Sequence, residues 1–311
     1  MKKSGLYIVY IFAILNASIV GLSFLFTKTA IMISSPLDTL AFRFTISFFA
    51  LLILALLKVV KINISLMTIK KLIPLALFYP TLFFSFQAFG LKYSPSSEGG
   101  ILFATTPIIT AIFASYFLKE KTNYIQKLSI LLSVFGVIFI FIMKGRSIDL
   151  DNLLGISLLL LSCLSISGYT VMARSLAKDF KPLDITFFML GLGLIFFNGM
   201  AIINHLNSGT LVEFVAPWSN MKFVISIVFL GIFASLVTSL LSNFILSKIS
   251  ASQMSVFSNL STIVSIIVGA IFLNETIHLH HIVGSIFIIL GVVGTNYFGN
   301  KKEKLKGNNC H

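Results

Sequence analysis

The sequence predicts an all-α polytopic membrane protein with ten transmembrane helices, arranged as two inverted five-helix repeats. The first observation is composition: the 311 residues are 57% hydrophobic and 11% charged, with a mean hydropathy of +1.00, whereas a soluble domain carries about a quarter charged residues. The second is that apolar runs of about 20 residues recur along the chain, each long enough to cross a hydrocarbon core of about 30 Å as a helix. The third is that one set of short motifs occurs in the same order in both halves.

The apolar segments are predicted to be helices because they are apolar throughout, whereas transmembrane strands alternate in polarity over about 10 residues. The first segment runs past the 7–15 apolar residues typical of a secretory signal and is followed by no small-residue cleavage site, so we expect a retained first helix. The ten predicted spans are Leu6–Thr27, Asp38–Leu57, Leu72–Leu91, Ser97–Leu118, Tyr124–Met143, Leu153–Leu176, Leu183–Asn204, Lys222–Leu246, Ser252–Leu273 and Leu279–Phe298.

The basic residues indicate how the chain is oriented. The net charge of +13 would suggest nucleic-acid binding in a soluble protein, but here the cations flank apolar spans, which is the pattern of membrane topology. With the amino terminus in the cytoplasm, 17 of the 23 Lys and Arg fall on cytoplasmic segments. The opposite side has five, and Arg43 lies within a span. We therefore predict a protein of the cytoplasmic membrane with both termini in the cytoplasm and no nucleic-acid partner.

The two halves repeat one another. "PLDTLAFRF" at Pro36–Phe44 is matched by "PLDITFFML" at Pro182–Leu190, and "YFLKEKT" is matched by "IFLNETI", which aligns Glu120 with Glu275. A glycine follows each glutamate by sixteen residues. This order divides the chain into a first repeat at 1–146, a second at 147–300 and a basic cytoplasmic tail at 301–311.

An odd number of spans per repeat places the second copy upside down relative to the first. The loop "LKEKTNYIQK" has three lysines and is predicted to be cytoplasmic, whereas its counterpart "LNETIHLHHI" has none and is predicted to lie outside. Inverted repeats with a site near the bilayer midplane are a recurring plan of secondary transporters.

The repeated order, the Pro-Leu-x-x-x-x-x-Arg entry ending at Arg43 and the two Leu-x-Glu helix ends resemble the EamA-type branch of the drug/metabolite transporter superfamily. The resemblance covers nearly the whole chain. It implies a ten-helix carrier in which helices three, four, eight and nine surround a central cavity that helices one and six help to line. It also implies substrates among amino acids, other small metabolites and drugs. The second repeat departs from the pattern at Met189, where an arginine would match Arg43.

Charged and kinking residues within the spans are candidates for handling a substrate. Arg43 is about 7.5 Å into its span at helical rise; it either anchors a substrate carboxylate or phosphate, or pairs with Glu98 or backbone carbonyls to hold the fold. Glu98 either caps the fourth helix or takes part in coupling. Pro80 and Pro107 each remove a helical hydrogen bond, which either exposes carbonyls to a cavity or only kinks the helix.

Polar residues at mid-span complete the candidates. Serines also pack helices or bond within their own helix, whereas amides and phenols in lipid need partners. The residues predicted to contact substrate are Asn16, Arg43, Tyr79, Thr106, Ser165, Tyr169, Ser239 and Asn259, and those predicted to act in gating or coupling are Glu98, Pro80 and Pro107.

These features favour a secondary transporter that works by alternating access, and the resemblance implies that it exports a small metabolite such as an amino acid or a related compound. The sequence shows no nucleophile–base pair, no metal-binding cluster at mid-depth and no Gly-rich phosphate loop, so we predict no enzymatic activity, no metal and no cofactor. The expected partners are a small-molecule substrate and the lipid bilayer; a homodimer and coupling to a proton or counter-substrate stay open. A flippase of a lipid-linked intermediate and an intramembrane enzyme are the alternatives.

Overall fold

The computed structural model describes residues 3–63, 66–93, 102–143, 153–273 and 277–307, and every regular element in these ranges is a helix. Nine helical segments of the described residues are long and apolar enough to cross a membrane, and Leu102–Phe117 is a shorter apolar helix. This confirms a multi-pass helical protein. The predicted fourth span, Ser97–Leu118, begins outside the described residues, and its described part is that shorter helix.

Several spans consist of more than one element. The third combines a π-helical segment with two α-helices, as does the eighth, and the ninth contains two α-helices. The elements are α1 (Lys3–Ile31), α2 (Pro36–Leu56), α3 (Leu66–Ala76), η1 (Leu77–Leu82), α4 (Phe83–Tyr93), α6 (Thr106–Phe117), α7 (Tyr124–Met143), α8 (Leu153–Leu176), α9 (Pro182–Ser208), α10 (Leu211–Val215), η3 (Ala216–Ser219), α11 (Met221–Gly231), η4 (Ile232–Val237), α12 (Thr238–Lys248), α13 (Ala251–Phe257), α14 (Leu260–Leu273) and α15 (Leu279–Gly307).

The helix ends follow local sequence signals. Ser35 caps α2 by accepting a hydrogen bond from the Asp38 N–H, and Pro36 occupies the first turn, where a missing N–H costs nothing. Gly209 ends α9 in the left-handed conformation, with φ +67°. The helix α9 extends four residues beyond the predicted span Leu183–Asn204, to Ser208, and the short helices α10 and η3 lie between it and α11.

Two spans are interrupted at corresponding places. The third span changes to π-helix in η1 and the eighth in η4, so the third helix of each predicted repeat carries the irregularity. In η1 the backbone of Tyr79 is extended, with φ −145° and ψ 121°, directly before Pro80. Such π segments leave backbone groups outside the regular helical ladder, and they are frequent at functional sites.

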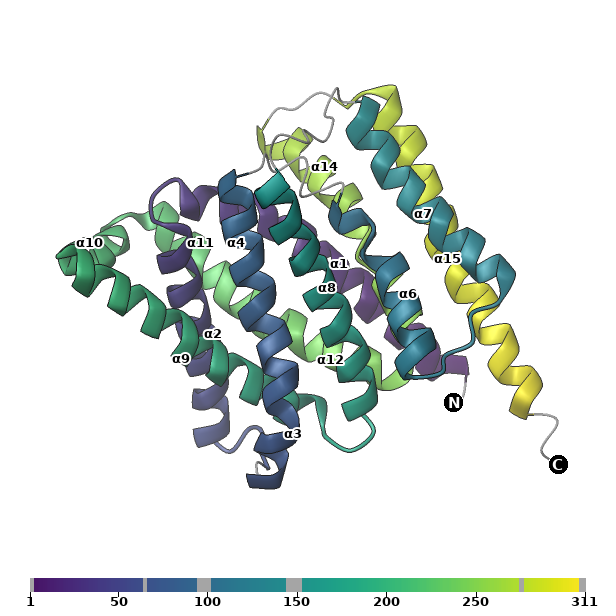
Figure 1. Cartoon of the computed structure of the whole chain (residues 1–311), viewed down its shortest axis with the longest axis horizontal. Coiled ribbons are helices and arrows are strands. Elements are labelled where there is room, and N and C mark those ends of the chain that lie inside the picture. The colour runs from purple at the N-terminus through teal and green to yellow at the C-terminus, as the bar shows by residue number, and fades with distance from the viewer. Residues whose placement is uncertain (1–2, 64–65, 94–101, 144–152, 274–276, 308–311) are drawn as a thin grey trace.

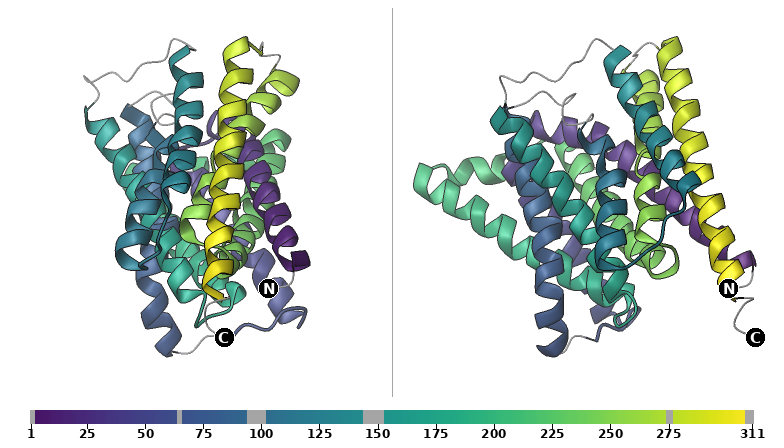
Figure 2. Two further views of the ribbon diagram at one scale, coloured as in Figure 1. Left: turned by 90° about the vertical axis from the view of Figure 1, so that its right-hand side faces the viewer. Right: turned by 45° about the vertical axis from the view of Figure 1, so that its right-hand side comes forward.

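Two pairs of helices at corresponding places in the predicted repeats, α2 with α9 and α7 with α15, pack together antiparallel. In the α2–α9 pair, Asp38 contacts His205 at one end and Asn63 contacts Asp184 at the other. The α7 and α15 helices lie side by side at one edge of the bundle (Figures 1 and 2). Gly136 of α7 meets the Gly284 carbonyl of α15 so closely that a methyl group there would come within 2.6 Å of it. Small residues therefore let these two backbones touch.

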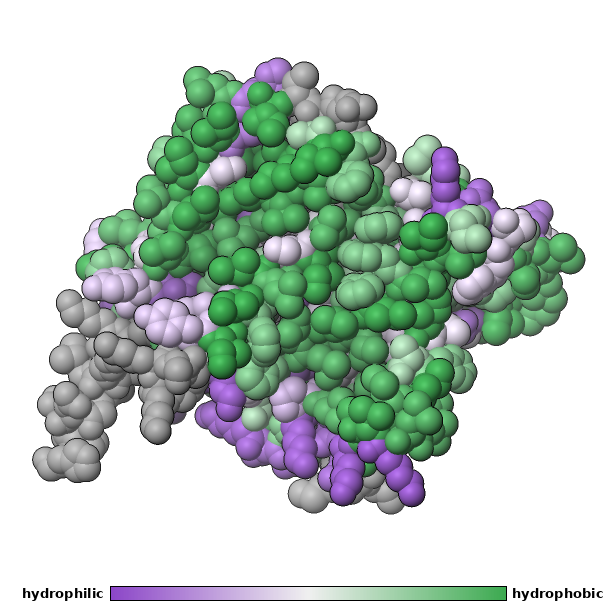
Figure 3. Space-filling model, turned by 180° about the vertical axis from the view of Figure 1, so that it is seen from behind, coloured by the Kyte–Doolittle hydropathy of each residue, from purple (hydrophilic) through white to green (hydrophobic). Residues whose placement is uncertain are grey.

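The outer surface suits a lipid environment. Large apolar side chains are exposed along the helices, for example Tyr116 (79%), Ile195 (76%) and Ile271 (65%). Figure 3 shows hydrophobic residues covering most of one face, with hydrophilic residues collected mainly along its lower edge and at the right-hand side of the view. A soluble monomer rarely exposes an apolar surface of this extent, so this face is expected to contact lipid. In Figure 2, α1 begins and α15 ends at the same end of the bundle.

Candidate functional site

A buried cation lies where α2 meets the irregular part of the eighth span. Arg43 is only 7% exposed. Its Nε donates a hydrogen bond to Ser235 Oγ at 2.5 Å, and its Nη2 donates to the carbonyl oxygen of Ala234 at 2.7 Å. Both acceptors belong to η4. The guanidinium carbon also lies 4.8 Å from the centre of the Phe84 ring, in a cation–π contact.

Two tyrosines from opposite halves meet beside this cation. Tyr79 of η1 stacks on Tyr169 of α8, with ring centres 4.8 Å apart and ring planes 29° from parallel. The Tyr79 side chain also interacts with Ser239, and it lies close enough to Arg43 for an electrostatic interaction with the guanidinium. The structure therefore brings together four residues that the sequence predicted separately: Arg43, Tyr79, Tyr169 and Ser239. We call these four residues the central cluster.

The central cluster continues into residues that the sequence prediction left out. The Tyr169 hydroxyl donates to Asn243 Oδ1 at 3.0 Å, and Asn243 Nδ2 donates to Thr186 Oγ1 at 2.9 Å. Ser235 and Asn243 stand four residues before and four residues after Ser239, so all three share one face of the eighth span. That spacing was the available signal. Nothing in the sequence brings Thr186 of α9 to the same place.

Comparison with known proteins agrees with this architecture. The sequence model of the EamA-like transporter family matches twice, at residues 7–142 and 153–297. The chain belongs to the EamA-like transporter family. It is 47% identical to the uncharacterized transporter YcxC of Bacillus subtilis (strain 168), over 96% of each chain. It is also 26% identical to an uncharacterized transporter of Archaeoglobus fulgidus, over 88% of this chain and 92% of that one.

A protein of known crystal structure has the same fold. It superimposes with a TM-score of 0.77 over 97% of this chain and 100% of that chain, at 17% sequence identity. The EamA-family chain is thus a membrane transporter. The names of its relatives do not specify a substrate. Neither its family nor its relatives indicate a catalytic activity.

The remaining predicted contact residues of this EamA-family chain have other surroundings. Asn16 of α1 meets Ser242 at 3.5 Å, and Asn259 Nδ2 donates to Ser133 Oγ of α7 at 3.0 Å. Ser165 donates to the Leu161 carbonyl within its own helix, at 2.7 Å. The Thr106 hydroxyl is buried next to the Cys163 thiol of α8. These contacts join helices or stay within one, and a role of these residues toward substrate stays a prediction.

The two predicted prolines occupy different positions. Pro80 is inside η1, which agrees with the predicted loss of a regular helical bond in the third span. Pro107 lies in the first turn of α6, next to the interruption at Thr105 within the apolar helix Leu102–Phe117. The predicted gating residue Glu98 lies outside the described residues.

Polar contacts tie the two halves together at opposite ends of the bundle. At one end, His205 Nε2 lies 3.0 Å from Asp38 Oδ1, and His205 Nδ1 lies 2.7 Å from Thr210 Oγ1. At the other end, Arg174 Nε lies 3.8 Å from Glu120 Oε1, which also accepts a hydrogen bond from the Ala251 N–H at the start of α13. These contacts join Glu120 of the first half to the second half.

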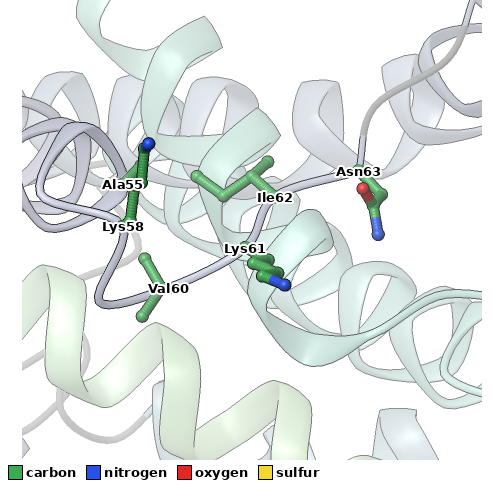
Figure 4. Close-up of a pocket in the computed structure, with 6 residues that line it drawn as sticks. All are labelled: Ala55, Lys58, Val60, Lys61, Ile62 and Asn63. Atoms are coloured by element: carbon green, nitrogen blue, oxygen red, sulfur yellow. The ribbon is translucent and has the colours of Figure 1, made fainter.

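Cavities of about 340 Å³ lie near both ends. One is lined by residues that include Asp38, His205 and Glu213. The other lies at the carboxyl end of α2, where Lys58, Lys61 and Asn63 are among its walls (Figure 4). Neither is lined by a residue of the central cluster. Arg43 and the tyrosine pair are therefore separated from both of these cavities by packed side chains.

Proposed function

We propose that this EamA-family transporter exports a small metabolite, such as an amino acid or a related compound, across the cytoplasmic membrane by alternating access. The two five-helix repeats are inverted relative to one another, both termini are cytoplasmic, and the substrate binds at the central cluster. The observation that carries this proposal is the convergence of the two π segments, η1 and η4, on one buried arginine.

Irregular backbone in a membrane protein is tolerated where it is enclosed by protein or lines a water-filled cavity. Transporters with repeats commonly place interrupted helices at corresponding positions, around a site near the midplane. Here the interruptions fall in the third and eighth spans, and their residues Tyr79, Ala234 and Ser235 surround Arg43. An ionisable residue in that position within a helical bundle suggests a functional site.

Helix directions support the inverted arrangement. Two repeats related by a two-fold axis in the membrane plane place each helix antiparallel to its counterpart. The α2–α9 pair and the α7–α15 pair both run antiparallel. Contacts between other helices also recur in both predicted repeats. The α4 helix packs on α8, and the corresponding helices α12 and α1 pack together. The α3 helix packs on α9, and the corresponding helices α11 and α2 pack together.

The transport test does not require knowing the substrate. Proteoliposomes with purified protein are incubated with a mixture of bacterial cytoplasmic metabolites, washed, and their contents identified by mass spectrometry. We expect one or a few unaltered metabolites to enter saturably with the wild type, and Tyr79→Ala to lose this uptake. Tyr7→Ala is the matched control, because Tyr7 is 67% exposed on α1.

Other outcomes would contradict the proposal in distinct ways. Contents identical to those of protein-free vesicles would refute solute transport. Movement of a labelled lipid-linked amphiphile without solute uptake would indicate a flippase. A chemically altered product would indicate an enzyme.

A separate experiment tests the inversion. Thr122→Cys and Ile277→Cys introduce single cysteines after the two matched Leu-x-Glu helix ends, in a Cys310→Ser background, and Cys163 is buried. With an impermeant thiol reagent on intact cells, we expect Ile277→Cys to react and Thr122→Cys to react only after the membrane is opened. Reaction of both from the same face would rule out inverted repeats.

A further inference from the structure

The positive charge of Arg43 has no negative counterpart among the described residues. Its hydrogen-bond partners there are a hydroxyl and a backbone carbonyl, and its stacking partner is Phe84. The described carboxylates of α2 and α9 are engaged at the ends of the bundle. Asp38 contacts His205, and Asp184 accepts a hydrogen bond from the Asn63 N–H. An isolated buried charge is costly unless it is paired, so this site favours a ligand that supplies the missing charge.

The guanidinium also has unused hydrogen-bonding capacity. A guanidinium carries five N–H donors in a planar fork that matches the two oxygens of a carboxylate. In the described structure Nε and Nη2 each make one hydrogen bond, and Nη1 makes none. An incoming carboxylate can therefore bind Arg43 without displacing Ser235 or Ala234.

The surroundings of Arg43 are aromatic. The rings of Tyr79 and Tyr169 are stacked, and Tyr79 also lies 5.4 Å, centre to centre, from both Phe83 and Phe84. A flat apolar group can enter between the two stacked tyrosine rings, because its own stacking on either ring replaces the tyrosine–tyrosine stacking that is lost. The residues around Arg43 thus offer one cation, two phenol hydroxyls and an apolar wall.

We propose that the ligand of the central cluster is a monovalent organic anion, a single carboxylate on a flat apolar body, with the carboxylate bound by Arg43. This inference rests on the proposed function and narrows its substrate: among small metabolites, it favours monovalent organic anions over zwitterionic amino acids. A monoanion brings the net charge of the occupied site to zero. A zwitterion leaves its ammonium without a carboxylate partner among the described residues, a cation is repelled, and a phosphate dianion leaves an excess negative charge.

Probes with one common body and different charges test this inference. The five probes are 3-phenylpropionate, phenylalanine, 3-phenylpropylamine, 3-phenylpropanol and, as the dianion, 3-phenylpropyl phosphate. The apparent affinity of each is measured from the concentration dependence of thermal stabilisation of the purified full-length protein, because a ligand that binds the folded state raises its stability by mass action. We expect the Kd of 3-phenylpropionate to be at least about tenfold lower than the Kd of any other probe, because one well-formed charge interaction changes affinity by about that factor.

Variants show whether Arg43 is the cause. Arg43→Gln keeps hydrogen-bond donors but removes the charge, and we expect it to bring the affinity for 3-phenylpropionate down to that for 3-phenylpropanol. Arg43→Lys should retain part of the preference, since an ammonium keeps the charge without the planar fork. Arg174→Gln is the control, because it removes an arginine at the end of the bundle and should leave the preference unchanged.

Several results would overturn the inference. These are equal or tighter binding of the zwitterion, the amine, the alcohol or the phosphate, survival of the acid's preference in Arg43→Gln, and absence of stabilisation by all five probes in folded wild-type protein. The proteoliposome experiment separates this inference from the proposed function. A zwitterionic or cationic metabolite entering the vesicles would contradict the charge inference alone, whereas entry of no metabolite would contradict transport itself.

Discussion

The contact between α7 and α15 allows a quantitative prediction about glycine. A methyl group at Gly291 would lie 2.5 Å from Ser133 Cβ, 2.6 Å from the Ser129 carbonyl oxygen and 2.6 Å from the Ser133 nitrogen. Ordinary contacts are about 3.5–4.0 Å, so Gly291→Ala would push the two helices apart by roughly 1 Å. Because two of these atoms are backbone, the strain cannot be relieved by a side-chain rotation. Overpacking of this kind costs about 1–3 kcal/mol.

Gly199 in α9 is the matched control, because a methyl group there would meet nothing within 4 Å. Replacing glycine by alanine inside a helix is itself favourable by up to about 1 kcal/mol, and this gain applies to both variants. The difference between Gly291→Ala and Gly199→Ala therefore isolates the clash, and we expect Gly291→Ala to be less stable by about 1–3 kcal/mol.

Equilibrium unfolding of the two purified variants in mixed micelles measures this difference directly. We expect the unfolding midpoint of Gly199→Ala to equal or exceed that of the wild type, and the midpoint of Gly291→Ala to fall below that of Gly199→Ala. Equal midpoints would refute the close α7–α15 approach and, with it, the role assigned to the small residues in that pair.

Three other predictions concern individual polar contacts. The Thr110 hydroxyl is buried without a partner among the described residues, so Thr110→Val should leave stability unchanged or raise it by up to about 1–3 kcal/mol in thermal unfolding, whereas Thr186→Val, which removes the acceptor of Asn243, should lower it. A double-mutant cycle of Tyr169→Phe and Asn243→Leu should give a coupling free energy of about 0.5–2 kcal/mol, and a value near zero would contradict the hydrogen bond between them. Glu120→Ala should lower the unfolding free energy by about 0.5–2 kcal/mol because it removes the cap of the Ala251 N–H, while Glu120→Gln, which keeps an acceptor oxygen, should lose less.

Most of the helices were predictable from the sequence because the bilayer imposes one requirement on every span, a continuous apolar run of sufficient length. Irregularities within spans were harder. Pro80 indicated the break in the third span, because proline removes a helical donor. The matching π segment at Ile232–Val237 contains neither proline nor glycine, and only Gly231 precedes it directly, so its sequence predicts a regular helix.

A residue of the central cluster was easier to predict when its type is rare within membrane spans. Arg43, Tyr79 and Tyr169 are expensive to bury unsatisfied, so each was a candidate on its own. Ser235 and Asn243 are polar residues of the eighth span that were not among the predicted contact residues; a serine in a span often only packs helices, so it is a weaker signal than a cation or a phenol. The Asp38–His205 contact joins residues far apart in the chain, at the ends of two spans, where polar residues need no special explanation.

The distribution of these contacts is consistent with two halves that rock about the central cluster, as alternating access requires. Among the described residues, one end has a buried histidine–aspartate pair, and the other has a partly exposed arginine–glutamate pair with a helix cap. A partly exposed pair contributes at most about 1 kcal/mol, whereas a buried polar pair costs more to break, so the end around Glu120 separates at the lower cost. The α7–α15 pair is held instead by backbone contact along its length, which cannot loosen gradually. Under the proposed mechanism, motion would therefore concentrate at the end around Glu120, with the α7–α15 pair moving least.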